Sequence, residues 1–84
     1  MNVQLKFFGA FRKYFDVEEL ELSEQVTVRD FRRQVRTDFL LRNASFDVIL
    51  LEDSVFATEE KVLSESDFIK PGAQIAILPP VCGG

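Results

Sequence analysis

The sequence predicts an α+β fold, in which one main helix packs on one face of a mixed β-sheet. Apolar and polar residues alternate over residues 2–8 and again over residues 17–22, which is typical of half-buried strands. Over residues 27–41 the apolar residues instead recur at helical spacing. A last apolar run, residues 75–78, precedes two prolines, which end a strand because they remove ladder donors. Strands on both sides of one helix in a short chain indicate a sheet with that helix across it.

Length and composition limit what this fold can do. The chain has 84 residues, enough for one domain with a thin core. Nine phenylalanines and no tryptophan predict that phenyl rings dominate this core. Because the chain has no histidine and one cysteine, we exclude histidine-based acid–base chemistry, cysteine-cluster metal sites and an intrachain disulfide. We therefore expect no metal and no bound cofactor.

Charge and hydropathy exclude two classes of partner. The net charge is −4, with eight basic and seven acidic residues in positions 1–42, and two basic and seven acidic residues in positions 43–84. Nucleic acid is not expected as a partner, because phosphate binding needs a basic surface. The acidic half can instead steer association with a basic protein surface. The longest apolar runs have four residues, too short for a membrane span, so we expect a cytoplasmic protein without a membrane partner.

The first two strands are predicted to pair as a hairpin. The apolar face of the first strand carries Val3, Leu5 and Phe7. The alternation breaks at Gly9, and residues 10–15 are expected to form a short irregular or helical turn. Residues 17–22 alternate again and are close enough in the chain to pair with the first strand. The glutamates of this second strand discourage pairing with other molecules.

The predicted helix begins at Thr27, which together with Asp30 three residues later is typical of a helix N-terminus. The apolar stripe of this helix is formed by Val28, Phe31, Val35 and Phe39. Its other faces carry Arg29, Arg32, Arg33 and Arg36. We expect these arginines to form a solvated helix face, and a docking patch is the alternative. The helix should end near residues 41–43, where Asn43 can adopt a left-handed conformation.

The second half of the chain is less clearly patterned. Residues 48–51 form either a buried strand or further helical structure, because a run of four does not distinguish the two. Shorter elements are expected at three places: strands at residues 55–57 and 61–63, and a turn at residues 70–72. The last strand, residues 75–78, is expected to pair in parallel with the first. The predicted domain, residues 1–80, is then a ubiquitin-like β-grasp.

The last four residues, 81–84, are expected to form a flexible Gly-Gly tail. Pro79 and Pro80 stiffen the exit from the last strand. Gly83 and Gly84 have no side chains, so they can thread a narrow channel and present a bare carboxylate to the active site of another protein. The alternative is a frayed terminus without function.

Two segments resemble a known family. Residues 70–84, KPGAQIAILPPVCGG, and residues 5–12, LKFFGAFR, are similar to the small subunit of molybdopterin synthase, within the MoaD/ThiS ubiquitin-like sulfur-carrier family. The resemblance implies that a MoeB-like adenylating enzyme, related to ubiquitin activators, uses ATP to activate Gly84. It further implies that Gly84 becomes a thiocarboxylate, enters a MoaE-like large subunit and donates sulfur to cyclic pyranopterin monophosphate in molybdenum cofactor biosynthesis. Such a chain is a sulfurtransferase subunit that is not catalytic alone.

The strand pattern also indicates where these partners bind. By alternation, Phe8 and Leu78 lie opposite Phe7 and Ile77, on the sheet face away from the helix. We expect this face to show apolar surface, which marks protein contacts, whereas coverage by loops is the alternative. The expected partner-binding residues are Phe8, Leu78, Pro79, Pro80, Val81 and Cys82.

Three other functions stay open. The chain can be a sulfur carrier for thiamine or another sulfur-containing metabolite, or a protein modifier whose Gly84 forms an amide with a lysine. It can also be a plain interaction module. Cys82 is a candidate nucleophile, but no basic neighbour in the tail activates its thiol, so a small spacer is the favoured interpretation.

Overall fold

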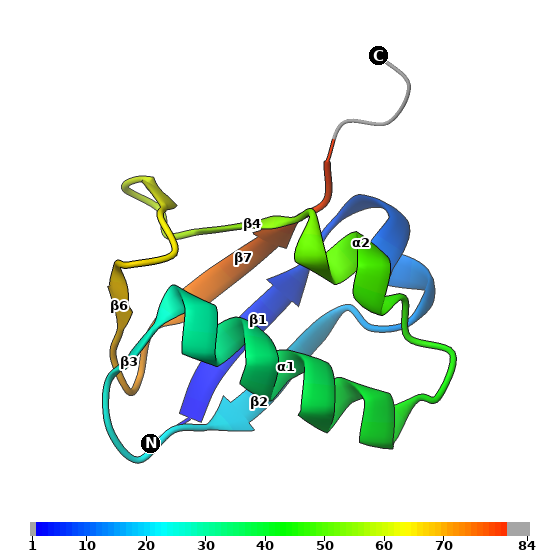
Figure 1. Cartoon of the computed structure of the whole chain (residues 1–84), viewed down its shortest axis with the longest axis horizontal. Helices are drawn as coiled ribbons and strands as arrows, with labels where there is room; N and C mark the ends of the chain where they lie inside the picture. The colour runs from blue at the N-terminus through cyan, green and yellow to red at the C-terminus, as the bar shows by residue number, and fades with distance from the viewer. Residues whose placement is uncertain (1, 81–84) are drawn as a thin grey trace.

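The computed structural model describes residues 2–80 and confirms the predicted α+β, β-grasp arrangement (Figure 1). The main sheet has the strand order β2-β1-β7-β4-β5. Its strands are β1 (Asn2–Phe7), β2 (Val17–Glu21), β4 (Val55–Ala57), β5 (Val62–Leu63) and β7 (Gln74–Leu78). A small second sheet pairs β3 (Val26–Thr27) with β6 (Phe68–Ile69). The helices are the 3-10 helix η1 (Gly9–Lys13), α1 (Val28–Arg42) and α2 (Val48–Glu52).

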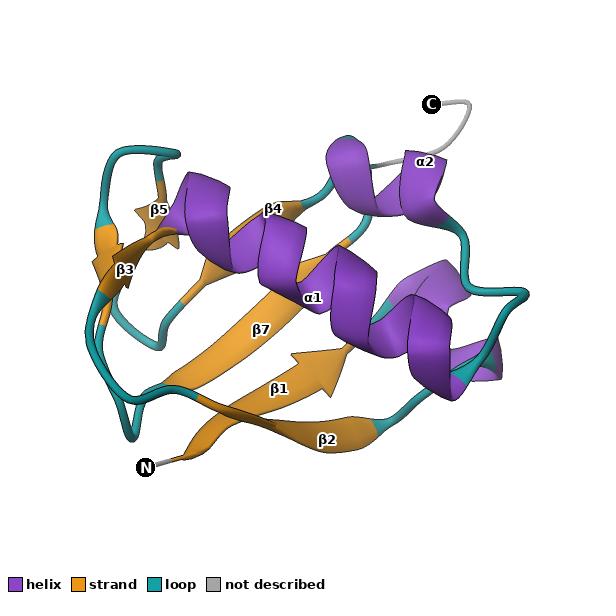
Figure 2. Cartoon of the chain, turned by 60° about the horizontal axis from the view of Figure 1, so that its bottom comes forward, coloured by secondary structure: helices purple, strands orange, loops and turns teal. Residues whose placement is uncertain are grey.

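The pairing at the centre of the sheet is the predicted one. β1 and β2 form an antiparallel hairpin, in which Val3 lies opposite Leu20. β7 pairs with β1 in parallel, with Phe7 opposite Ile77, and its other edge pairs antiparallel with β4. β7 therefore lies between two neighbours in the middle of the sheet, and α1 crosses one face of that sheet (Figure 2). The last strand is held on both edges before the chain reaches Pro79.

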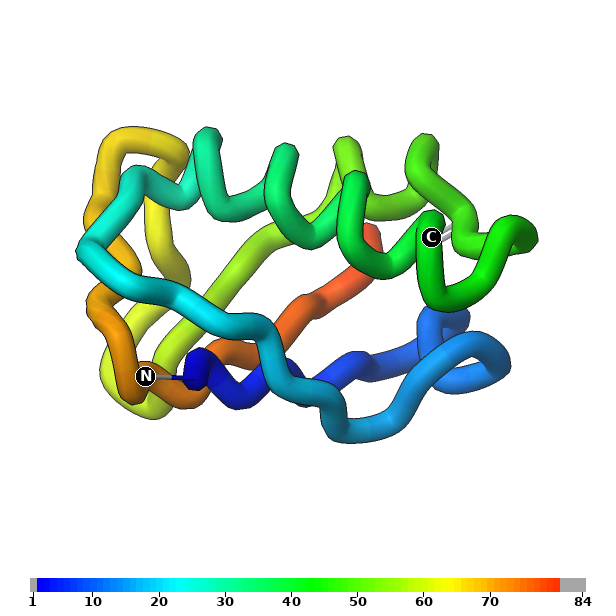
Figure 3. Tube along the Cα trace, turned by 90° about the horizontal axis from the view of Figure 1, so that it is seen from below, coloured from blue at the N-terminus to red at the C-terminus, as the bar shows by residue number. Residues whose placement is uncertain are grey.

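The helix α1 lies as a separate layer over the main sheet (Figure 3), and the core between the two layers combines phenyl rings with aliphatic side chains. Phe7 of β1 is fully buried, and its ring centroid lies 5.3 Å from that of Phe39 and 5.8 Å from that of Phe11. Nearer the start of α1, Phe31 packs edge-on against Phe56, with the two ring centroids 5.8 Å apart. These edge-to-face contacts confirm the predicted phenylalanine-rich core, and they bury much apolar area per residue in a small domain.

The helix α1 begins as predicted but ends differently. The Thr27 hydroxyl accepts a hydrogen bond from the Asp30 N–H at 3.2 Å. The left-handed conformation predicted for Asn43 is wrong, because this residue is extended, with φ −150° and ψ 105°. Its side-chain oxygen accepts the Ser45 N–H at 2.9 Å, and its carbonyl accepts the Phe46 N–H at 3.0 Å. The chain therefore leaves α1 in an extended conformation and turns toward the buried Phe46, instead of adopting the left-handed conformation at the helix end.

The segment after α1 resolves an ambiguity of the sequence. Residues 48–51 are helical, because Asp47 caps the N-terminus of α2 by accepting the Leu50 N–H at 2.9 Å. The predicted strand at 55–57 is confirmed as β4, and the one at 61–63 is confirmed as the shorter β5. The small sheet of β3 and β6 was not predicted, because two residues are too few to show a period.

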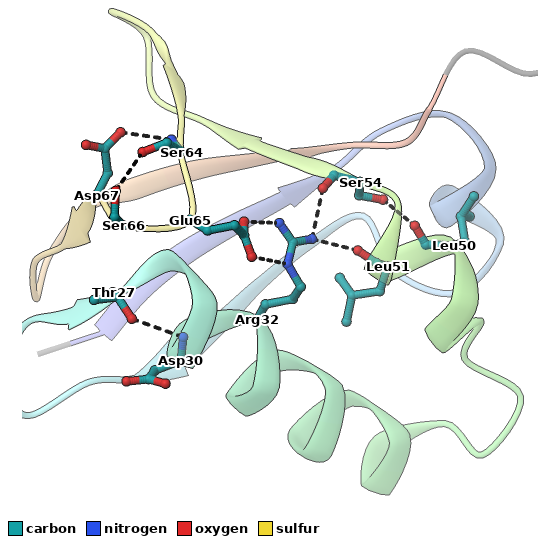
Figure 4. A network of polar contacts seen from close by, with 10 residues as sticks. All are labelled: Thr27, Asp30, Arg32, Leu50, Leu51, Ser54, Ser64, Glu65, Ser66 and Asp67. Atoms are coloured by element: carbon teal, nitrogen blue, oxygen red, sulfur yellow. Dashed lines mark hydrogen bonds and ion pairs between the residues drawn. The ribbon is translucent and has the colours of Figure 1, made fainter.

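The prediction of a solvated arginine face on α1 is wrong for Arg32. Its side chain is buried, and Nη1 donates to the carbonyls of Leu51 and Ser54 at 2.7 and 2.9 Å (Figure 4). Nη2 and Nε donate to the two carboxylate oxygens of Glu65 at 2.6 and 3.2 Å. The guanidinium also stacks 4.6 Å from the centroid of the Phe56 ring. The long apolar stem of arginine allows the side chain to pass along the edge of the core, so that its guanidinium joins α1 to two loops. The other arginines of the predicted face are exposed, namely Arg29, Arg33 and Arg36.

This contact makes stability depend on pH through Glu65. Its hydrogen bond from Arg32 holds the pKa of Glu65 below the ordinary value of 4.5, although partial burial opposes the shift. Because the folded pKa is lower than the unfolded one, the stabilisation is present above about pH 4.5 and is lost as pH falls through the folded pKa. We expect wild type to lose more stability than Glu65→Gln when urea unfolding is compared between about pH 6 and pH 3. A difference that does not change with pH contradicts this account.

Candidate functional site

The chain leaves the sheet at Pro79 and Pro80, directly after the central strand β7 (Figure 1). Pro79 is half-buried and Pro80 is exposed. Both lack a backbone N–H, so neither can extend the ladder with β1 or β4. The predicted site residues Val81, Cys82, Gly83 and Gly84 lie outside the described residues. The described part of the site is therefore the exit of the tail and the sheet face beside it.

Gly9 is a residue of the exit that sequence reasoning did not select. It has a positive φ of 58°, which favours glycine. A Cβ atom added at this position would lie 2.8 Å from Cγ of Pro79, closer than packed carbon atoms approach. Gly9 thus leaves the space that the Pro79 ring occupies. The break in alternation at Gly9 was the available signal, but only the parallel pairing of β1 with β7 brings the two residues together.

Phe8 and Leu78 lie side by side at this exit. The Phe8 N–H donates to the carbonyl of Ile77 at 3.2 Å, which continues the parallel ladder by one residue. Phe7 and Ile77 are fully buried beneath α1, whereas Phe8 and Leu78 are half-buried. Strand alternation therefore places Phe8 and Leu78 on the sheet face opposite α1, as the sequence predicted.

We call this surface the open face and define it by Phe8, Val17, Val55, Val62, Ala76 and Leu78. The ladder register gathers these residues: Val55 lies opposite Leu78, and Val17 and Ala76 flank Lys6 from either side. The three valines of the open face were not predicted to lie there. Val17 is 43% exposed, Val55 is 42% exposed and Val62 is 60% exposed. The open face is an apolar surface next to the tail exit, of the kind that marks protein contacts.

A hollow of about 380 Å³ indents the open face. It is lined by Gln4, Lys6, Phe8, Ala57, Thr58, Glu59, Gln74, Ile75 and Ala76. The facing alanines Ala57 and Ala76 are too small to fill the space between β4 and β7. Lys6 lies over the Phe8 ring, with its Nζ 5.5 Å from the ring centroid, and Glu59 contributes the opposite charge. The hollow thus combines apolar walls with two charges.

The carboxyl groups with a lowered pKa lie away from the open face. The two carboxyl groups whose pKa is lowered, Glu65 and Asp67, belong to the loop between β5 and β6, and neither lines the hollow. The pKa of Asp67 is lowered chiefly because its carboxylate accepts the Ser64 N–H at 2.8 Å. Over residues 2–80, no three Cys, Asp or Glu side chains gather as metal ligands.

The same part of the chain, residues 2–80, contains no helix with the length and apolarity of a membrane span.

Sequence comparison assigns the chain to a family. The model of the ThiS family matches residues 5–84, which is nearly the whole chain and includes its last residue. The chain belongs to the ThiS family. It is thus a ubiquitin-like sulfur carrier of the ThiS/MoaD kind and is not catalytic alone. No curated protein sequence matches it significantly.

Solved structures share the fold of this ThiS-family chain. A proposed molybdopterin converting factor subunit 1 from Pyrococcus furiosus is 24% identical, with a TM-score of 0.68, covering 96% of this chain and 99% of that one. SAMP1 from Haloferax volcanii is 18% identical with a TM-score of 0.68, and each chain is covered fully. In a complex of subunits 1 and 2 of the molybdopterin-converting factor from Helicobacter pylori 26695, the match is 22% identical with a TM-score of 0.61, again over both full chains. At these identities the likeness shows the fold.

Proposed function

We propose that this sulfur carrier is the sulfur-donating small subunit of a molybdopterin synthase. The observation that carries the proposal is the family match, which runs through Gly84 and so includes the Gly-Gly that follows the proline exit. The resemblance of residues 70–84 and 5–12 to the small subunit of molybdopterin synthase favours this branch of the family. The sulfur acceptor in this proposal is cyclic pyranopterin monophosphate, in molybdenum cofactor biosynthesis.

Gly84 carries the sulfur in this proposal. A free carboxylate is ionised at neutral pH and is a poor electrophile. A MoeB-like enzyme joins a Gly84 carboxylate oxygen to the α-phosphorus of ATP and releases pyrophosphate. A sulfur nucleophile then displaces AMP, so that one carboxylate oxygen is replaced by sulfur in a thiocarboxylate. Gly83 has no side chain, which permits the close approach that both steps need.

We propose that the open face supplies most of the binding affinity for the partners. Ordering a short terminal segment costs conformational entropy, so residues 79–84 alone supply little affinity. The apolar residues of the open face can supply it, because Phe8 and Leu78 are half-exposed beside the tail exit and Val55, opposite Leu78 in the ladder, is exposed. The two proposed partners are a MoeB-like adenylating enzyme, which binds the ATP, and a MoaE-like large subunit, which binds the sulfur acceptor.

Phe8→Ala and Leu78→Ala should each weaken binding to both partners by about 1–2 kcal/mol, as interface anchors do. The free energy of unfolding should change less, because both side chains are half-buried. Ile49→Ala is the matched control, since Ile49 is 74% exposed on α2 and lies outside the open face. Titration calorimetry measures the affinities. Unchanged affinity of both folded variants for both partners would place the docking surface elsewhere, with the exposed arginines of α1 as the next candidate.

The intact mass of protein purified from its own cell tests the function. The proposal expects the mass to rise by one exchange of oxygen for sulfur, with the change located at Gly84. Two equivalents of the loaded chain, each donating one sulfur, should then convert one cyclic pyranopterin monophosphate to a dithiolene product together with a MoaE-like subunit, and leave two chains with a Gly84 carboxylate. Loading without transfer to this acceptor supports a carrier for thiamine or another metabolite. Amide adducts between Gly84 and lysines of other proteins support a modifier instead.

A further inference from the structure

The exit of the tail is built around one close contact. The Pro79 ring occupies the space that a side chain at Gly9 would need, with Cγ at 2.8 Å and Cδ at 3.5 Å from an added Cβ. The φ of Gly9 is 58°, so this position is also strained for other residues. Two independent features of Gly9, its missing Cβ and its backbone conformation, therefore allow the chain to turn from β1 into η1 next to Pro79.

Both sides of this contact are held by the fold. On one side, β7 is paired with β1 up to Ile77 and with β4 up to Leu78, and the ring of Pro79 fixes its own φ. On the other side, η1 is anchored by Phe11, which is fully buried, and the Phe11 N–H donates to the carbonyl of Phe8 at 3.3 Å. A proline ring seated between two fixed elements has little freedom to change direction.

We propose that Gly9 is a positioning residue, which sets the direction in which the chain leaves the domain after Pro79 and thereby the rate at which Gly84 reacts. The inference rests on the proposed role of Gly84. Gly9 itself takes no part in the chemistry. A side chain at residue 9 pushes the Pro79 ring aside and redirects the following residues, and a small error in the position of a reacting group costs about 100-fold in rate.

The geometric part can be measured without any enzyme. The single cysteine, Cys82, takes one spin label, and Arg33→Cys on the exposed side of α1 takes the second. Pulsed electron resonance then gives the distribution of distances between the two labels. Gly9→Ala should shift this distribution. Gly72→Ala is the matched control, because Gly72 also has a positive φ, 89°, but lies before β7, at the end of the strand away from Pro79.

A second variant tests whether the Pro79 ring transmits the effect. In a Pro79→Ala background the ring is absent and only the backbone strain at residue 9 remains, so Gly9→Ala should cause a much smaller shift than it causes in the wild-type background. Pro79→Ala alone should broaden the distribution, and this keeps the proposal testable if Gly9→Ala does not fold. Without labels, adenylation of Gly9→Ala by a MoeB-like enzyme should show a kcat lower by about tenfold or more, with KM within about threefold of wild type.

The outcomes separate the two claims. An unchanged distance distribution in folded Gly9→Ala, or an equal shift in Gly72→Ala, overturns the positioning role. A shifted distribution with an unchanged adenylation rate also overturns it. If the distribution shifts as expected but the wild-type chain is never adenylated, the proposed function has failed, and the control of direction by Gly9 stands by itself.

Discussion

Removal of Gly84 is expected to abolish sulfur loading of this chain while leaving its free energy of unfolding unchanged. The deletion draws the terminal carboxylate back by about 3.3–3.6 Å, the span of one extended residue. Misplacing a reacting group by 1 Å already costs about 100-fold, so we expect a loss beyond this factor. The buried core found in residues 2–80 lies between Val3 and Ile77, and stability should not respond.

The measurement pairs thiocarboxylate formation, read by mass spectrometry in a reconstituted system, with urea unfolding of the same sample. A chain extended by one alanine after Gly84 should fail in the same way as the deletion. Cys82→Ser is the matched control, and it should load almost as well as wild type, because the terminal carboxylate accepts the sulfur. Full loading of the extended, unprocessed chain would show that Gly84 is not the residue that carries the sulfur.

Phe31→Ala is expected to lower the free energy of unfolding by about 3–5 kcal/mol, the range for a buried phenylalanine. Phe31 is fully buried in the first turn of α1, and its ring meets Phe56 edge-on. Domains have about 5–15 kcal/mol of stability in total, and one this small belongs near the lower end. Much of the variant should therefore unfold near body temperature, which a thermal unfolding curve will show.

Leu41→Ala provides the comparison on the same helix. Leu41 is 82% exposed on α1, so its truncation should change stability by less than about 0.5 kcal/mol. If Phe31→Ala costs less than about 1 kcal/mol, the packing of α1 on the sheet is not what stabilises the fold. Comparing two apolar side chains on one helix separates the effect of burial from the effect of helix propensity.

Local patterns were sufficient for the elements that span the domain. Val3, Leu5 and Phe7 are all buried, because strand alternation is a property of the backbone and needs no tertiary information. Thr27 caps α1 as predicted, since capping involves atoms only three residues apart. The same alternation assigned Phe8 and Leu78 to the outer side of the sheet.

Predictions failed where long-range contacts override local preference. Asn43 has an intrinsic tendency toward the left-handed region, but the burial of Phe46 draws the chain into an extended path. Arginine is usually found in solvent, yet a carbonyl of α2, the Ser54 carbonyl and the Glu65 carboxylate satisfy the guanidinium of Arg32. Neither set of partners can be found from residues adjacent in sequence, because they lie 19 to 33 positions away.

The sequence by itself determined the fold class, the buried faces of β1 and β7, the apolar stripe of α1, and Gly84 as the candidate sulfur carrier, since each follows from short-range periodicity or from the family's terminal motif. The tertiary structure alone decided which residues surround the tail exit. The parallel pairing of β1 with β7 places Gly9 against Pro79 and adds Val17 and Val55 to the open face. The physical reason is that strand register, set by the whole core, determines which distant side chains become neighbours.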